Sequence, residues 1–196
     1  TLTAADGCQN SACGLDGHAF RAGEMLAGSG MILQAGRDVL NIGSNVGAAG
    51  SIIADAGNDI RSEALTSQFL INYLNQKKKF FGITYQTTKI IENFGFIQDA
   101  SIASEFGDVS LKATRDILLN GSALSAGATV NGEAGRDIKM ASVAEEITNY
   151  TSKSGIIGFG IGSQKRNWNG FVTAFPTIEA NDIALNAGNN LSAIGS

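Results

Sequence analysis

Hydrophobic and polar positions alternate in short runs along this chain, and each run ends at a small residue. Leu33-Gln34-Ala35, Leu111-Lys112-Ala113 and Leu185-Asn186-Ala187 all follow the order apolar, polar, small. A period of two residues is typical of a strand with one buried face. The 3.6-residue spacing of apolar positions that a helical repeat requires is missing from these runs. The pattern therefore predicts an all-β chain built from short strands.

One motif recurs along the chain at a fixed interval. AGRDV at 35–39 recurs 21 residues later as AGNDI at 56–60, and ATRDI at 113–117 recurs at the same interval as AGRDI at 134–138. The second pair repeats the first, since 31–62 aligns with 109–140 without a gap, and a degenerate copy, LNAGNNL, occupies 185–191. Short strands joined by Gly and Asx bends at a constant interval predict a parallel β-helix, a solenoid whose coils stack about 4.8 Å apart.

The stacking of coils predicts which side chains lie one above another. We expect Ile60 to lie over Val39 and Ala56 over Ala35. The polar residue that follows each bend is part of the same repeat, at Asp38, Asp59, Asp116, Asp137 and Asn190. Calcium-binding repeats also combine Gly with Asp, but their period of about nine residues is less than half of the interval found here. We therefore interpret these side chains as structural acceptors of backbone N–H groups, with Arg37 offsetting repulsion between stacked carboxylates.

Two longer segments, at about 63–108 and 142–180, interrupt the regular coils of a repeat region that spans 31–196. Both contain a lysine followed by two bulky apolar residues, a glycine and an alternating run, in KKKFFGITYQ at 77–86 and KSGIIGFGIGSQ at 153–164. We interpret each segment as a β-hairpin or an extended excursion from the coil. A short helix stays open for residues 66–76, where several bulky side chains share one helical face.

The same segments hold the candidates for contact with a membrane or a partner. Three consecutive cations, Lys77, Lys78 and Lys79, are suited to anionic lipid or lipopolysaccharide, although lysines also keep strand edges from pairing. The apolar candidates are Phe80, Phe81, Phe159, Ile161 and Trp168. These side chains are either exposed for a partner or packed over the coil.

Residues 1–30 form an N-terminal segment whose fold the repeats do not predict. Cys8 and Cys13 lie close together in the sequence, which suits a small disulfide loop in a secreted chain, with two unpaired thiols as the alternative. Together with His18 they fall short of the four ligands of a zinc site, so we expect no metal.

Composition and motifs narrow the function classes. The formal net charge of −4 argues against nucleic acid as the main partner, since phosphate contacts need clustered cations. No apolar stretch is long enough to suggest a transmembrane helix. His18 is the only histidine and lacks a nucleophile elbow, no phosphate-binding or dinucleotide motif is present, and the adjacent Glu145 and Glu146 point to opposite faces of a strand. We therefore expect a protein that is not an enzyme and needs no cofactor.

The paired AGRDV and AGRDI units, with their lysine-led and Gly-rich insertions, resemble the haemagglutinin repeats of filamentous-haemagglutinin-like exoproteins. These are large products of bacterial two-partner secretion and include the effectors of contact-dependent growth inhibition. The resemblance covers about residues 31–196 and is closest to the second, more C-terminal repeat region. It implies a right-handed parallel β-helix, export through an outer-membrane transporter, display on a Gram-negative cell surface and a periplasmic stage.

Three functions follow from this reading. The first is delivery of a toxin across the outer membrane of a target cell, for which the resemblance offers no catalytic residues. The second is direct adhesion to a glycan or protein on a host cell. The third, and weakest, is a polysaccharide-active β-helix enzyme.

Overall fold

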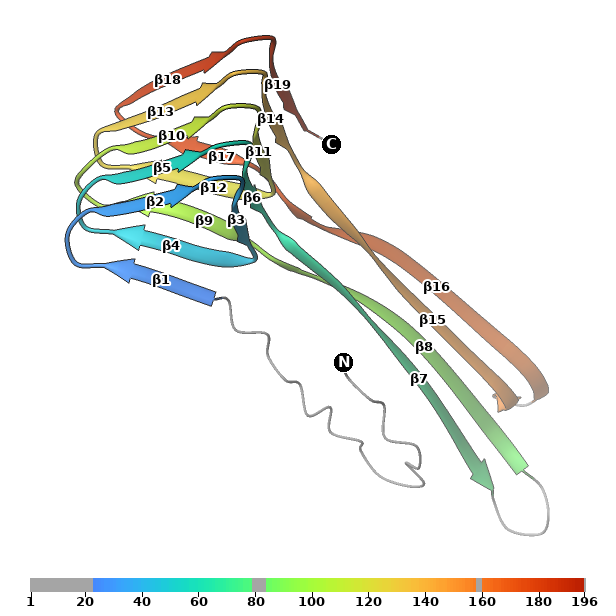
Figure 1. The fold of residues 1–196 in the computed structure, drawn as a ribbon. Coiled ribbons are helices and arrows are strands. Elements are labelled where there is room, and N and C mark those ends of the chain that lie inside the picture. Colours follow the sequence, from blue (N-terminus) through green and yellow to red (C-terminus); the bar gives the residue numbers. More distant parts are fainter. Residues whose placement is uncertain (1–22, 79–83, 158–159, 196) are drawn as a thin grey trace.

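The structure is a computed structural model that describes residues 23–78, 84–157 and 160–195. Its strands form three parallel sheets that wrap around one core, and a fourth, antiparallel sheet that projects away from them (Figure 1). The first sheet contains β1 (Gly23–Ala27), β4 (Ser44–Ala48), β9 (Ala100–Ser104), β12 (Ser122–Ala126) and β17 (Thr177–Glu179). The second contains β2 (Met31–Ala35), β5 (Ile52–Ala56), β10 (Val109–Ala113), β13 (Thr129–Ala134) and β18 (Asp182–Ala187). The third contains β3 (Val39–Ile42), β6 (Ile60–Glu63), β11 (Ile117–Asn120), β14 (Asp137–Ala141) and β19 (Asn190–Ile194).

The chain visits the three parallel sheets in turn, so that three successive strands make one coil. Coil 1 is β1 to β3, coil 2 is β4 to β6, coil 3 is β9 to β11, coil 4 is β12 to β14 and coil 5 is β17 to β19. Each strand pairs in parallel with its equivalent in the next coil. The predicted parallel β-helix is confirmed, and Ile60 pairs with Val39 and Ala56 with Ala35 as expected.

The core consists of columns of equivalent side chains, one from each coil. Val39, Ile60, Ile117, Ile138 and Leu191 form one such column in the third sheet. Its three central isoleucines are 0 to 1% exposed. Burying an isoleucine side chain contributes about 1.5–3 kcal/mol, so each added coil extends the core by a similar increment.

A polar network is also enclosed in coils 1 to 4. Asn41 donates hydrogen bonds from Nδ2 to Ser62 Oγ at 3.0 Å and to the Ser101 carbonyl at 3.0 Å. Ser122 Oγ donates to Ser62 Oγ at 2.6 Å. No buried side-chain nitrogen or oxygen of the described residues lacks a partner, so the network does not leave a polar atom unpaired in the core.

The projecting sheet is formed by two long hairpins. The first is β7 (Leu65–Lys78) with β8 (Thr84–Gln98), and the second is β15 (Val143–Ile157) with β16 (Gly160–Ala174). At about 3.3 Å per residue, strands of this length reach about 50 Å from the coils. Residues 66–76, for which the sequence also allows a short helix, form a strand, because they pair residue by residue with β8.

The excursions are shorter than the sequence suggests. The expected boundaries of 63–108 and 142–180 include β9 and β17, which the structure places in the first parallel sheet. These strands lack the AGRD motif, since that motif marks the bend between the second and third sheets. Toward the N-terminus the β-helix begins earlier than expected, because β1 lies within the segment 1–30.

The corner between the third and first sheets takes two forms. In coils 1 and 3 the chain turns through a single glycine, Gly43 at φ 53° and Gly121 at φ 56°, a conformation that other residues rarely adopt. After coils 2 and 4 a hairpin replaces this turn. A Cβ on Gly121 would lie 3.0 Å from the Cβ atoms of Ala64 and Ala174, which flank the two hairpins. The glycine turn is therefore packed between the bases of the hairpins.

The spacing of the hairpins matches the spacing of the coils. Two coils separate one hairpin from the next and advance about 9.6 Å, which is also the width that two paired strands occupy. The second strand of one hairpin can therefore pair with the first strand of the next. Residues Thr148 to Gly155 of β15 pair with Asn93 to Gln86 of β8, which joins both hairpins in one sheet.

Candidate functional site

Two features of the structure concern the residues that the sequence singles out, and the first is a ladder of bend carboxylates. Asp38 accepts a hydrogen bond at Oδ1 from the Asp59 N–H at 3.2 Å, and Asp59 Oδ1 accepts one from the Asp116 N–H at 3.3 Å. Asp116 Oδ1 accepts from the Asp137 N–H at 3.2 Å, and Asn190 Nδ2 donates to Asp137 Oδ1 at 3.0 Å. Each donor belongs to the next coil, so every carboxylate joins two coils.

Cations flank the ladder at each level. Arg136 donates from Nε to Asp116 Oδ1 at 3.1 Å and from Nη2 to Oδ2 at 2.6 Å. Arg61 and Arg115 lie 3.3 and 3.4 Å from the carboxylate of Asp59. These pairs offset the repulsion between carboxylates that lie one coil apart. Arg37, which the sequence predicts in this role, contributes less, because it lies farther from its partner, at 3.9 Å from Asp38, and is largely exposed.

The ladder shifts the acidity of two of its members. Burial raises the pKa of the Asp116 carboxyl, but the hydrogen bonds from Arg136 and from the Asp137 N–H outweigh it, and the pKa lies below its usual value. The side-chain hydrogen bond from Asn190 lowers the pKa of Asp137 against its partial burial, with help from Lys139. Both groups are held as structural carboxylates whose partners belong to the β-helix.

The second feature is the projecting sheet, which is a single layer with exposed bulky side chains. Trp168 is 57% exposed, Phe171 71% and Leu70 69%. Leu74, Phe94, Phe96 and Phe175 are also exposed. Both outer strands, β7 and β16, have a partner on one side only among the described strands. Exposed bulky side chains on both faces of a single-layer sheet are suited to interaction with a membrane or a partner.

Charges are separated along the projecting sheet. The half that lies away from the coils, here called the distal half, comprises the described residues 74–78, 84–89, 151–157 and 160–166. It holds six of the chain's 14 Lys and Arg residues and none of its 18 Asp and Glu residues. The distal half thus carries a formal charge of +6, and the remainder of the chain carries −10.

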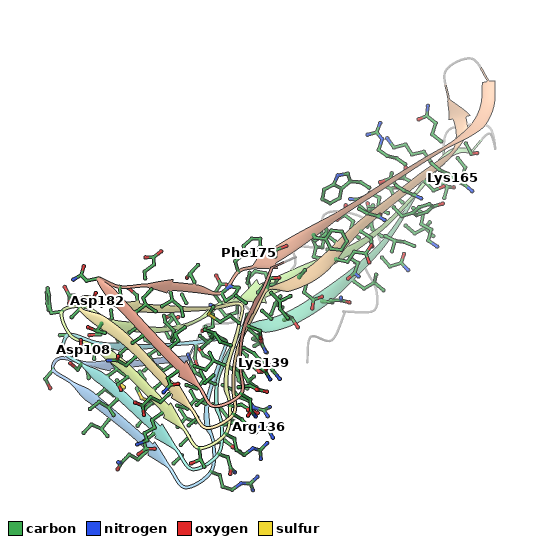
Figure 2. All side chains as sticks on the ribbon, turned by 90° about the horizontal axis from the view of Figure 1, so that it is seen from above. Asp108, Arg136, Lys139, Lys165, Phe175 and Asp182 are labelled. Atoms are coloured by element: carbon green, nitrogen blue, oxygen red, sulfur yellow. The ribbon has the colours of Figure 1, made fainter. Side chains whose placement is uncertain are left out.

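Four cations of the distal half have described side chains: Lys89, Lys153, Lys165 and Arg166. All four are exposed. The register places Lys89 and Lys165 in one row across the sheet, on either side of Ser152. Lys153 and Arg166 are on the opposite face, because side chains alternate along a strand. Figure 2 shows Lys165 far from Arg136 and Lys139, which lie on the coils.

Sequence reasoning finds part of this surface. Lys77 and Lys78 end β7, and Trp168 lies on β16, but Lys79, Phe80, Phe81 and Phe159 lie outside the described residues. Ile161 is a residue of β16. The sequence-based prediction misses the cations of β8, β15 and β16, although the lack of acidic residues across both hairpin ends is visible in the sequence. Cys8, Cys13 and His18 also lie outside the described residues, so the disulfide stays a prediction.

Other kinds of site find no support in the described part of the chain. Within it, no group of three or more His, Cys, Asp or Glu side chains is arranged to hold a metal ion. No helix that could cross a membrane is found in residues 23–78, 84–157 and 160–195.

Comparison with known protein families gives one match. The family described as "Hemagglutinin repeat" matches residues 62–157 and again 97–175, which together exceed half of the chain. Comparisons with curated proteins and with solved structures give no match. The matched residues include coils 3 and 4 and both hairpins, so they contain the unit of two coils and one hairpin. Proteins of this family are structural and adhesive modules of secreted surface proteins. The chain therefore belongs to the haemagglutinin repeat family of filamentous-haemagglutinin-like proteins, as a β-helical segment of a secreted, adhesin-like exoprotein.

Proposed function

We propose that this segment helps to carry a toxin across the outer membrane of a contacted target cell. In this proposal a two-partner-secretion transporter exports the exoprotein to the surface of a Gram-negative cell, after a periplasmic stage. The projecting sheet is the part that meets the target cell. The observation that supports this role is the exposure of Trp168, Phe171 and Leu70 on a single-layer sheet that no described element covers.

A projecting single-layer sheet with exposed apolar side chains is unfavourable in water. A β-helix needs no projecting sheet for stability, because its coils already bury a continuous core. Large apolar side chains held away from that core lose the free energy of burial unless a membrane or a partner covers them. Strands that reach roughly 50 Å from the coils also place the distal half of the sheet where a neighbouring cell is met first.

The single-glycine corner shows how each hairpin can be deleted without disturbing the coils. Residues 64–99 are replaced by one glycine, so that Glu63 is followed by Gly and Ala100, in the register of Ile42-Gly43-Ser44. Residues 142–175 are replaced likewise, so that Ala141 is followed by Gly and Pro176, in the register of Asn120-Gly121-Ser122. The doubly deleted segment should keep its five coils, because coils 1 and 3 already close in this way.

The deletion is tested within the full-length exoprotein by measuring growth inhibition of contacted target cells, with surface display checked by antibody. We expect normal display and loss of inhibition. A matched control replaces two exposed apolar residues on the outside of the coils, Ile32→Ser and Leu40→Ser, and should inhibit like the parent. Undiminished inhibition without the hairpins contradicts the proposal.

The exposed aromatic side chains also support direct adhesion as a second function. Saturable binding of the isolated chain to host cells or to a glycan, abolished by the same double deletion, is the expected result for an adhesin. If the parent exoprotein binds in this way and never inhibits contacted cells, adhesion replaces delivery.

A further inference from the structure

We propose that the distal half of the projecting sheet docks tip-first on a membrane whose lipids carry anionic phosphate groups. This inference rests on the proposed function and names the surface that the sheet recognises. It depends on the separation of charge, on the unpaired state of the four described distal cations and on the apolar side chains beside them.

Separated charge orients the molecule before contact. The distal half carries +6 and the remainder −10, so an anionic surface attracts the end of the sheet and repels the coils. A molecule with this charge distribution approaches with the hairpin ends leading. The long strands of each hairpin also keep the acidic coils several Debye lengths from the anionic surface, since the Debye length is about 8 Å at physiological salt.

The four distal cations whose side chains the structure describes are free for an external anion. All five ion pairs of the described residues involve coil residues, from Arg37 with Asp38 to Lys139 with Asp137. None involves Lys89, Lys153, Lys165 or Arg166 within the described part of the chain. Lys153 and Arg166 are diagonal neighbours on adjacent strands, because Lys153 pairs with Gln164 and Thr151 with Arg166. Like charges so placed repel each other, and an anion between them relieves the repulsion.

The distribution of cations over both faces favours an approach by the tip. Lys89 and Lys165 are on one face and Lys153 and Arg166 on the other, so laying either face flat on a surface would leave half of them unused. Entry of the tip into the headgroup layer lets both faces contact phosphate at once. Long cationic side chains are suited to this position, because their stems lie along apolar surface while the charges stay among the headgroups.

Apolar side chains next to the cations distinguish a membrane from a soluble polyanion. Leu74 pairs with Lys89 and is 58% exposed, and Trp168, two residues from Arg166, is 57% exposed. The Trp168 ring lies over Gly170, where a Cβ would come within 2.8 Å of Cη2. An exposed indole beside cations is typical of protein at the boundary between headgroups and acyl chains.

The test uses the whole chain and vesicles of phosphatidylcholine, either pure or with phosphatidylglycerol as a sixth or a third of the lipid. We expect no binding without phosphatidylglycerol, binding that rises with its fraction, and weakening by salt. Each cation near an anionic surface contributes about fivefold in binding, so Lys153→Gln with Arg166→Gln should reduce binding about 25-fold. The matched control, Arg37→Gln with Lys112→Gln, removes the same charge from the coils and should bind within about twofold of the parent.

Trp168 supplies a second readout because it is the only tryptophan of the chain. Its emission should shift to the blue on anionic vesicles and become protected from aqueous iodide. Equal loss of binding in both double variants, binding that ignores phosphatidylglycerol, or retention on immobilised sulfated polysaccharide without vesicle binding would each overturn the inference. Toxin delivery that is lost without the hairpins but is unaffected by Lys153→Gln with Arg166→Gln overturns the inference and leaves the proposed function standing.

Discussion

At the scale of single residues, the bend carboxylates act as connectors between coils. Each accepts the N–H of the equivalent residue one coil further on, so a donor that would face solvent at the bend is paired instead. Stacking places like charges near each other, and Arg61 of the same coil and Arg115 and Arg136 of the next coil compensate for it. The ionised carboxylates of Asp116 and Asp137, whose pKa values are lowered in the fold, therefore strengthen the ladder.

Acid should weaken the ladder at Asp116 and Asp137. The pKa of both carboxyls is lowered in the folded protein, so the unfolded chain binds more protons as the pH falls. Their contribution to stability is complete above the unfolded pKa of about 4 and is lost as the pH falls through the folded pKa. Thermal unfolding followed from pH 7 to pH 2.5 should show this loss.

The variant Asp116→Asn isolates the effect. It keeps an oxygen for the Asp137 N–H but loses the ion pair with Arg136, so it should be less stable at pH 7 and less sensitive to acid. The control is Asp55→Asn, on the exposed outer face of β5, which should retain the acid sensitivity of the parent. If thermal stability falls with pH in the same way in Asp116→Asn and in the parent, the ladder does not titrate.

These contacts are predictable in kind but not in detail. The repeat indicates that Asp38 and Asp59 stack and act as backbone acceptors, because equivalent positions one coil apart must lie together. It does not indicate that the donor comes from the next coil. Nor does it indicate that Arg136, rather than a residue like Arg37, supplies the closest cation, because this depends on side-chain direction at the bend.

At the scale of elements, the bends between the second and third sheets stack as closely as the strands do. Gly57 donates its N–H to the Ala35 carbonyl at 2.9 Å and lies directly over Gly36. A Cβ on Gly57 would lie 2.2 Å from the Gly36 carbonyl oxygen, and one on Gly188 would lie 2.2 Å from the Gly135 oxygen. Glycine at positions 57 and 188 allows this close approach between coils, whereas coil 3 has Thr114 at the same position of the repeat.

Gly36 and Gly57 make a matched pair for this argument. Gly57→Ala should destabilise the chain by about 1–3 kcal/mol, because the backbone of one coil must move away from the other. Gly36→Ala occupies the same position in the repeat, but nothing lies within 4 Å of its added Cβ, so its effect should be small. Urea unfolding of both variants measures the difference, and equal losses of stability would contradict the packing argument.

The elements themselves are largely readable from the sequence, apart from the ends of the hairpins. Strand alternation predicts β2 and β10 because one face of each is buried. The strands β9 and β17 fall within the predicted excursions, since no repeated motif marks the corner where they begin. Residues 66–76 suit both a strand and a helix, and pairing with β8 decides for the strand. That pairing is a tertiary contact that local periodicity does not contain.

At the scale of the whole molecule, the β-helix and the projecting sheet share one spacing. Hairpins leave the β-helix after coils 2 and 4, and the second strand of the first pairs with the first strand of the second (Figure 1). The four strands form a continuous sheet only because two coils and two strands have the same width. The cationic distal half is thereby assembled from residues of both hairpins.

Adding a coil should break this match. A second copy of residues 100–121, inserted after Gly121, adds one coil of three strands between the hairpins. The distance between β8 and β15 then grows from about 4.8 to about 9.6 Å, which is too wide for hydrogen bonds between them. Hydrogen exchange should show faster exchange at 86–93 and 148–155 and unchanged protection in the coils. Retained protection in both strands would contradict the shared spacing.

The common spacing also limits how such a protein can change its length in evolution. Tandem duplication of a gene segment can add any number of residues, but only a copy of two coils with one hairpin leaves the pairing between hairpins intact. Shorter copies would open a gap in the sheet and expose new strand edges, with the hazard of aggregation that such edges carry. Surviving variants should therefore differ in length by whole units, and each unit would widen the cationic front by two strands.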